Sequence, residues 1–253
     1  MDMIITEAPI YMIMFTGGAM GHFIAQVILS IKYDRSYFNI SNDGSCHALR
    51  YNKNRNFCYL RVGGNHYESI KKRIINLDYD LDNSSKRIDR RSFKKRFRIP
   101  KKDKPDIFYI TKEVNPWYLT TNHFHFSEND CYDTFENTVS QFPNLKFLVI
   151  QSYESDIELL TMLKHKKDID KQPYKDVVRQ IERDNNCKVN MLKYLDSKSI
   201  NYTTIEFRNI IDNPLLCYNI ICDYLGENSI LQQDILQKWN DYISINEKLY
   251  GKL

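Results

Sequence analysis

Residues 9–32 read PIYMIMFTGGAMGHFIAQVILSIK, and this stretch decides the fold. Its six apolar residues at 10–15 form a run short enough for a buried central strand. A glycine-rich turn follows at residues 16–21, and the apolar residues of 23–31 then recur at helical spacing. A strand, a glycine loop and a helix in this order let backbone amides and the positive end of a helix dipole receive an anion. The stretch therefore predicts the phosphate-binding corner of an α/β fold.

Strands and helices are expected to alternate along the rest of the chain. Segments rich in β-branched and aromatic residues predict strands at 57–62, 106–112, 117–125, 146–150 and 202–207. Helical spacing predicts helices at 66–75, 132–141, 157–163, 177–195, 214–225 and 231–250. Such alternation is typical of a mainly parallel sheet with helices on both faces. We expect one three-layer α/β/α domain over residues 1–253.

Composition favours a globular protein of a reducing compartment. The chain has 253 residues, of which 42% are hydrophobic, enough to bury a substantial core. Its six cysteines include no CxxC pair and no Cys/His cluster at metal spacing. Asp2 and Glu7 stand where a signal peptide has basic residues, and glycines interrupt any membrane span. We expect a cytoplasmic protein without a membrane segment or a bound metal.

Positive charge is concentrated in residues 86–104. This segment has 11 lysines and arginines against two aspartates, whereas the whole chain has a net charge of only +4. It is interpreted as part of a surface loop or insertion around residues 77–105. Three roles stay open: a solvated loop, a clamp for an anionic substrate or nucleotide, and a contact with a polyanion such as nucleic acid. Phe93 and Phe97 lie among the charges, which favours a binding surface.

The glycine loop departs from two widespread phosphate-binding motifs. Alignment of Gly21 with the second glycine of GxxxxGK[ST] puts Thr16 at the first glycine. His22 then replaces the lysine and Phe23 the Ser/Thr, so magnesium-dependent hydrolysis of a nucleoside triphosphate is not expected. The spacing of the glycines in residues 17–21 also does not fit GxGxxG. Anion binding and simple backbone clearance in a tight turn both stay open as roles for the loop.

Several segments resemble the sulfotransferase family, whose fold is related to that of the P-loop kinases. TGGAMGHF at 16–23, followed by an apolar helix, looks like the family's 5′-phosphosulfate loop. YLTTNHFHF at 118–126 is similar to the strand that ends in the family's catalytic histidine. TTIEFRNIIDNPLLCYNIICDYLG at 203–226 is similar to its last strand, loop and helix ending in Leu-Gly. KFLVIQSYESDIELL at 146–160 stands where its 3′-phosphate strand and helix are expected.

The resemblance implies a P-loop NTPase-like fold and a transferase activity. A sulfuryl group would move from 3′-phosphoadenylyl sulfate to a hydroxyl or amine acceptor, without a metal. His123 is the implied general base, because a neutral histidine can take the proton of the attacking acceptor. His125 is a second candidate, and ordinary surface roles for both histidines stay open. The implied donor site consists of Thr16, Gly17, Gly18, Ala19, Met20, Gly21, His22, Phe23 and Ser152.

Three positions of the family pattern are not filled. Ala19 or Met20 stands where the family has its loop lysine, and no arginine lies between the strand at 146–150 and Lys164. Arg208 and Asn209 stand where the family has an acidic pair after its last strand. The basic segment at 86–104 is one source for the missing cations. Two alternatives therefore stay open. One is a fucosyltransferase-like glycosyltransferase, suggested by GGAMGHFIAQVI at 17–28, and the other is a non-catalytic binding protein on a P-loop-like scaffold.

Overall fold

The computed structural model places about half of the chain, with the N-terminal loop corner and the C-terminal half the most complete. It describes residues 9–33, 38, 40, 44, 46, 57–62, 117–123, 139–140, 144–165, 173–228, 233–251 and 253. For residues 33, 57–62, 117–123 and 165 it describes the backbone alone. The predicted strand at 106–112, the predicted helix at 66–75, the basic segment and most of the predicted helix at 132–141 lie outside these residues.

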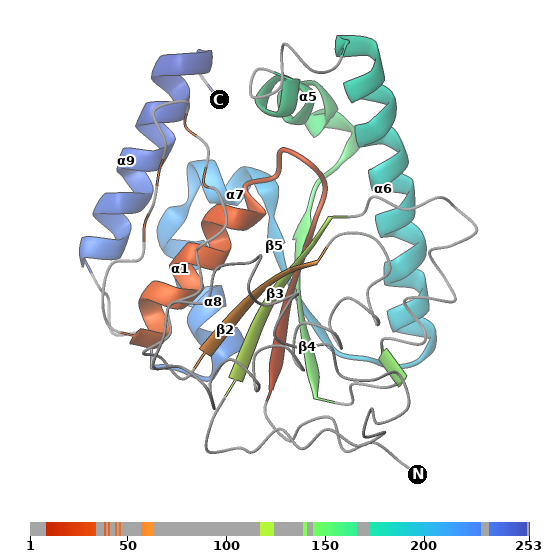
Figure 1. Cartoon of the computed structure of the whole chain (residues 1–253), viewed down its shortest axis with the longest axis vertical. Helices are drawn as coiled ribbons and strands as arrows, with labels where there is room; N and C mark the ends of the chain where they lie inside the picture. The colour runs from red at the N-terminus through yellow and green to blue at the C-terminus, as the bar shows by residue number, and fades with distance from the viewer. Residues whose placement is uncertain are drawn as a thin grey trace, which may run out of the picture.

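A parallel sheet forms the centre of the described part of the chain (Figure 1). Its five strands lie in the order β2-β3-β1-β4-β5, and every neighbouring pair is parallel. The carboxyl ends of all these strands therefore meet at one edge of the sheet. The strands are β1 (Ile10–Phe15), β2 (Phe57–Val62), β3 (Trp117–His123), β4 (Leu145–Gln151) and β5 (Tyr202–Glu206).

Helices cover both sides of this sheet. In Figure 1, α1, α8 and α9 lie on one side and α5 and α6 on the other. The short helix α7 follows β5 without a loop, and the 3₁₀ helix η1 leads from β4 towards α5. The helices are α1 (Gly21–Tyr33), η1 (Glu154–Asp156), α5 (Ile157–His165), α6 (Tyr174–Ser197), α7 (Phe207–Asp212), α8 (Pro214–Leu225) and α9 (Gln233–Tyr250). The predicted mixed α/β class with a parallel sheet is confirmed.

The central strand β1 is buried along its whole length. Alternate side chains of a strand point to opposite faces, so Tyr11, Ile13 and Phe15 share one face. All three belong to the core that α1, α8 and α9 cover, where the Tyr11 ring meets the Tyr224 ring edge-on at 5.4 Å. A strand buried on both faces needs apolar residues at every position, which explains the unbroken run at 10–15.

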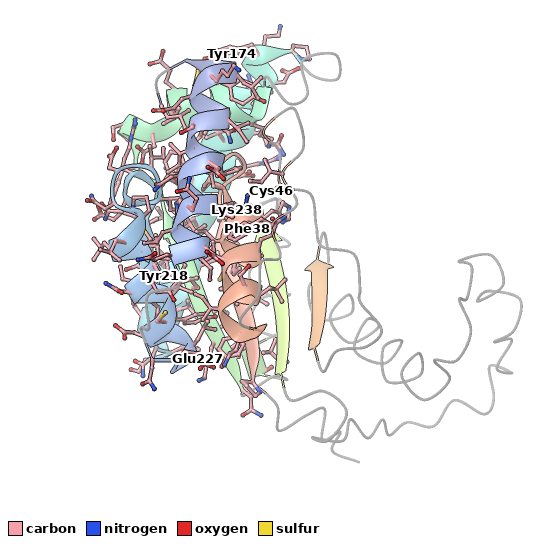
Figure 2. The ribbon with its side chains drawn as sticks, turned by 90° about the vertical axis from the view of Figure 1, so that its left-hand side faces the viewer. Phe38, Cys46, Tyr174, Tyr218, Glu227 and Lys238 are labelled. Atoms are coloured by element: carbon pink, nitrogen blue, oxygen red, sulfur yellow. The ribbon has the colours of Figure 1, made fainter. Side chains whose placement is uncertain are left out.

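Aromatic packing fixes α1 against α9. The Phe23 ring stacks on the Tyr242 ring, with centroids 4.1 Å apart and an angle of 4° between the planes. The same ring meets the Trp239 ring edge-on at 5.2 Å, and the Trp239 indole N–H donates to the Ile210 carbonyl at 2.8 Å. In the side view of Figure 2, α9 lies along α1. The first helix of the chain is thus part of a core that residues of the last described helix complete.

Most predicted elements are found; the bounds predicted at 10–15, 57–62 and 214–225 are those observed, and the others are shifted at one or both ends. The predicted strand at 117–125 ends at His123, and the predicted helix at 177–195 spans Tyr174–Ser197. The predicted strand at 202–207 is one residue too long, because Phe207 begins α7 instead. Phe207 and Ile210 are both buried, so the turn into a helix places two apolar side chains in the core. None of the helices in the described ranges combines the length and the apolar character that a membrane crossing requires.

Candidate functional site at the carboxyl edge of the sheet

The loop from β1 to α1 is a tight turn with two residues at positive φ. Gly18 has a φ of +90°, and Met20 has a φ of 57°. The Ala19 N–H donates to the Thr16 carbonyl at 3.0 Å and closes the turn. The Met20 carbonyl then accepts the N–H groups of Phe23 and Ile24 at 2.9 and 3.1 Å, which starts α1. The sequence TGGAMG folds this way because glycine adopts positive φ without a steric penalty.

Close packing explains why the loop has three glycines. A Cβ at Gly18 would lie 2.6 Å from the backbone carbonyl oxygen of Leu160 in α5. A Cβ at Gly17 would lie 2.8 Å from the Lys164 Nζ, and one at Gly21 would overlap the ring of Phe15. Thr16, Gly17, Ala19 and Met20 are all buried, whereas Gly18 and His22 are partly exposed. The glycines therefore provide backbone clearance, and α5 lies directly against the loop.

A buried lysine from α6 reaches the end of β4. Lys188 is only 1% exposed, and its Nζ donates to the Ser152 carbonyl, to the Ser152 hydroxyl at 3.2 Å and to the Asn185 Oδ1 at 2.5 Å. The Ser152 hydroxyl lies 3.3 Å from the Thr16 hydroxyl, so this lysine is linked to the glycine loop through one side chain. Burial lowers the pKa of Lys188 to about 8, and the negative charge of Asp156 opposes that shift.

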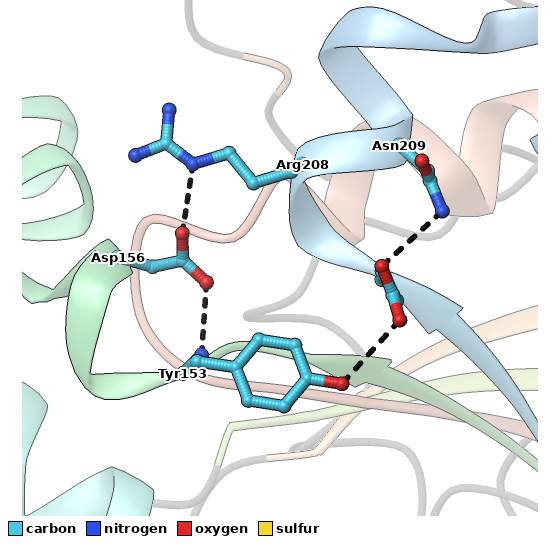
Figure 3. Close-up of polar contacts among 5 residues, drawn as sticks. Tyr153, Asp156, Arg208 and Asn209 are labelled. Atoms are coloured by element: carbon cyan, nitrogen blue, oxygen red, sulfur yellow. Dashed lines mark hydrogen bonds and ion pairs between the residues drawn. The ribbon is translucent and has the colours of Figure 1, made fainter.

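A second polar group joins the end of β4 to the end of β5 (Figure 3). Asp156 accepts the Tyr153 backbone N–H at Oδ2 and the Arg208 Nε–H at Oδ1, both at 2.8 Å. Glu206 lies 3.4 Å from the Tyr153 hydroxyl and 3.5 Å from the Asn209 amide nitrogen. Burial raises the pKa of Tyr153, and the charge of Glu206 raises it further. The edge thus has two carboxylates engaged with donors and one arginine beside them.

The structure brings together part of the site predicted from the sequence. Ser152 lies beside Thr16, as the resemblance implied, and His22 lies in the first turn of α1 with its ring edge-on to Phe15 at 5.4 Å. The backbone of His123 pairs with Phe15, so the end of β3 is next to the loop. His125 lies outside the described residues.

Two members of the predicted donor site are turned into the core. The Phe23 side chain is fully buried between α1 and α9, and Ala19 is also fully buried. The Phe23 N–H is already bonded to the Met20 carbonyl. Neither side chain is therefore placed to contact a ligand at the carboxyl edge.

Sequence reasoning assigned none of the three cationic residues at this edge, Lys164, Lys188 and Arg208, to the site. Lys188 had a detectable signal, because it interrupts the buried stripe of α6 at helical spacing. That stripe consists of Val177, Ile181, Asp184, Lys188, Met191 and Leu195. A charged residue inside an apolar stripe indicates a buried polar contact. Lys164 and Arg208 had no such signal, since they come from α5 and α7 and meet the edge only through the tertiary fold.

The described residues contain no group of three or more His, Cys, Asp or Glu side chains that could hold a metal ion. Comparison of the chain with family models, curated proteins and solved structures found no match. Function is therefore inferred from the chemistry of the carboxyl edge.

Proposed function

We propose that the protein is a divergent sulfotransferase with a P-loop NTPase-like α/β/α fold. It binds 3′-phosphoadenylyl sulfate at the carboxyl edge of its sheet and transfers the sulfuryl group to a hydroxyl or amine acceptor. One observation carries the proposal: the glycine loop, Ser152 and cationic side chains from three different helices meet at this edge. Open α/β sheets bind ligands there, outside the carboxyl ends of their strands.

The positive charge of the edge supports a phosphorylated donor. The sulfotransferase pattern includes a lysine in the glycine loop, and residues 16–23 contain none. In the fold, the Lys164 Nζ lies against Gly17, and Lys188 adds a buried positive charge behind Ser152. Arg208 stands at the end of β5. These side chains provide, from α5, α6 and α7, the cations that stabilise phosphate groups.

The proposed transfer needs a base but no redox chemistry. The acceptor oxygen or nitrogen attacks the sulfur of the donor, and the bond from sulfur to the bridging phosphate oxygen breaks. The acceptor proton goes to a base, for which His123 is the candidate because β3 ends beside the loop. The leaving group is adenosine 3′,5′-bisphosphate, whose new negative charge the cations of the edge stabilise.

Two lesser expectations also remain proposals. A cytoplasmic location is supported by Cys217 and Cys222, which are buried thiols in α8 without a disulfide. Contact with a polyanion through residues 86–104 rests on their charge alone.

Calorimetry with adenosine 3′,5′-bisphosphate tests the donor site. Wild type is expected to bind, and Lys164→Gln to bind about 10- to 100-fold more weakly, since a charged hydrogen bond contributes about 1.5–3 kcal/mol. Lys193→Gln is the matched control, because Lys193 is an exposed lysine on α6. Gly18→Asp would not serve as a binding test, because the added Cβ would clash with the Leu160 carbonyl of α5 and disturb the fold as well.

The wild-type result decides the proposal. Absence of binding to the bisphosphate would refute it. Binding of a nucleoside-diphosphate sugar in its place would favour the glycosyltransferase alternative. Incubation with 3′-phosphoadenylyl sulfate and a panel of hydroxyl and amine acceptors then tests catalysis. His123→Ala is expected to lower turnover by 10²- to 10⁴-fold, which is the usual contribution of a general base.

A further inference from the structure

Arg208 and Asp156 form an ion pair with unequal exposure. Asp156 is 1% exposed, whereas the side chain of Arg208 is 42% exposed. The Asp156 carboxylate is held at both oxygens, since Oδ2 accepts the Tyr153 N–H and Oδ1 accepts the Arg208 Nε–H. The aspartate is therefore fixed, and it holds the guanidinium group through Nε alone.

This geometry leaves the terminal nitrogens of Arg208 directed away from the aspartate (Figure 3). A guanidinium group has five N–H donors in one plane, and the bond from Nε uses one of them. Among the described residues, Asp156 is the only partner of Arg208. The four N–H groups of the two terminal nitrogens form a planar fork that matches two oxygens of a phosphate or sulfate.

The fork belongs to the same edge as the glycine loop. β5 ends at Glu206 and α7 begins at Phe207, so Arg208 is two residues beyond the end of a strand. The pairs Met14–Val149 and Val149–Thr204 set the carboxyl ends of β1, β4 and β5 level with one another. Neighbouring strands lie about 4.8 Å apart, so the end of β5 is about 10 Å from the start of the loop.

We propose that Arg208, aligned by the buried Asp156, binds a phosphate group of the ligand at the carboxyl edge. The inference deepens the proposed function, on which it rests for the identity of the ligand. Arg208 is the binding residue, and Asp156 is a positioning residue that does not touch the ligand. The competing explanation is that Arg208 only neutralises Asp156. An arginine with that role alone would not change the affinity for an anion.

The variants must separate binding from folding, because Arg208→Gln leaves a buried carboxylate without its partner and such a loss is strongly destabilising. Arg208→Lys retains a cation for Asp156 but loses the fork. The double variant Arg208→Gln/Asp156→Asn removes both charges and leaves no unpaired ion. Arg183→Gln is the control, because Arg183 is exposed on α6. Circular dichroism and thermal melting verify that each variant is folded.

Calorimetry with two probes, adenosine 3′,5′-bisphosphate and inorganic pyrophosphate, gives the readout. The double variant is expected to bind both about 10- to 100-fold more weakly than wild type, with Arg208→Lys in between and Arg183→Gln unchanged. Asp156→Asn is expected to weaken binding when Arg208 is present but not in the Arg208→Gln background. A purely structural role of Asp156 would not produce that non-additivity.

The two probes also separate this inference from the proposed function. If wild type binds the bisphosphate and folded Arg208 variants bind it equally well, the inference is wrong and the proposed function stands. If wild type binds pyrophosphate through Arg208 but does not bind the bisphosphate, the inference stands and the proposed function is wrong. Binding of neither probe to wild type overturns both.

Discussion

The contact between the glycine loop and α5 can be tested with a pair of glycine substitutions. Gly18→Ala adds a Cβ that would lie 2.6 Å from the Leu160 carbonyl oxygen, whereas carbon and oxygen normally approach to about 3.3 Å. The methyl group meets backbone, which cannot rotate away as a side chain can. Such overpacking lowers the stability of the folded state by about 1–3 kcal/mol. The φ of +90° adds about 1–2 kcal/mol for a residue with a Cβ, so the total loss of stability is about 2–5 kcal/mol.

Gly226→Ala is the matched control. Gly226 ends α8 with a φ of +66°, and a Cβ there would have nothing within 4 Å. Gly226→Ala should therefore lose only the stability that a Cβ at positive φ costs, about 1–2 kcal/mol, because it introduces no clash. The difference between the two variants, about 1–3 kcal/mol, measures the contact of the loop with α5.

Urea unfolding followed by circular dichroism gives both values, provided that the dependence of the free energy on urea is the same in each variant. An equal loss at the two sites, or a smaller one at Gly18, would mean that α5 does not lie against the loop. The carboxyl edge would then be more open than described.

Three further predictions test the core and the buried ionisable groups by the same unfolding measurement. The Cβ that Gly21→Ala adds overlaps the Phe15 ring, so this variant should lose about 1–3 kcal/mol of stability. Phe15→Leu in the same chain should recover part of that loss. If the stability losses of the two substitutions simply add, this packing is contradicted. Lys188 has a pKa lowered from 10.5 to about 8, so the native state releases its proton first. The free energy of unfolding of wild type should therefore rise by about 2 kcal/mol relative to that of Lys188→Met between pH 8 and pH 10. Parallel plots of unfolding free energy against pH for the two proteins would refute this. Cys217 has a pKa raised from 9.0 to about 12, so its thiol ionises first in the unfolded state. Between pH 8 and pH 10 the free energy of unfolding of wild type should therefore fall by about 1.3 kcal/mol relative to that of Cys217→Ala. A rise would refute this.

The elements that the sequence could predict are those whose pattern is local. The apolar run at 10–15, the glycine turn and the helix after it are adjacent in the chain, so their order alone indicates a strand, a loop and a helix. The end of β5 was harder to predict, because Phe207 suits a strand by propensity and is nevertheless the first residue of a helix. Tertiary burial of Phe207 and Ile210 outweighs that preference.

The candidate site could be predicted only in part, because its cations come from separate helices. Ser152 was named because it lies two residues beyond a predictable strand, in the segment that resembles the family's 3′-phosphate strand and helix. Arg208 was noticed only as a departure from a pattern, and its partner Asp156 is 52 residues away in the chain. Phe23 was assigned to the donor site as the last residue of TGGAMGHF, the segment that resembles the 5′-phosphosulfate loop, but successive residues of a helix point in different directions. Its ring packs on Tyr242 instead.

The packing of α1 against α9 has a consequence for the order in which the protein folds. Phe23 stacks on Tyr242, Lys32 pairs with Glu227 at 2.6 Å, and Asn246 donates to the Gly44 carbonyl across 202 positions of sequence. Contacts of such high sequence separation slow folding, because the chain loses loop entropy before they form. During synthesis, Phe23 has no aromatic partner in α9 until residues 233–250 leave the ribosome. The glycine corner is among the first parts to be made, and we expect it to be among the last to become rigid.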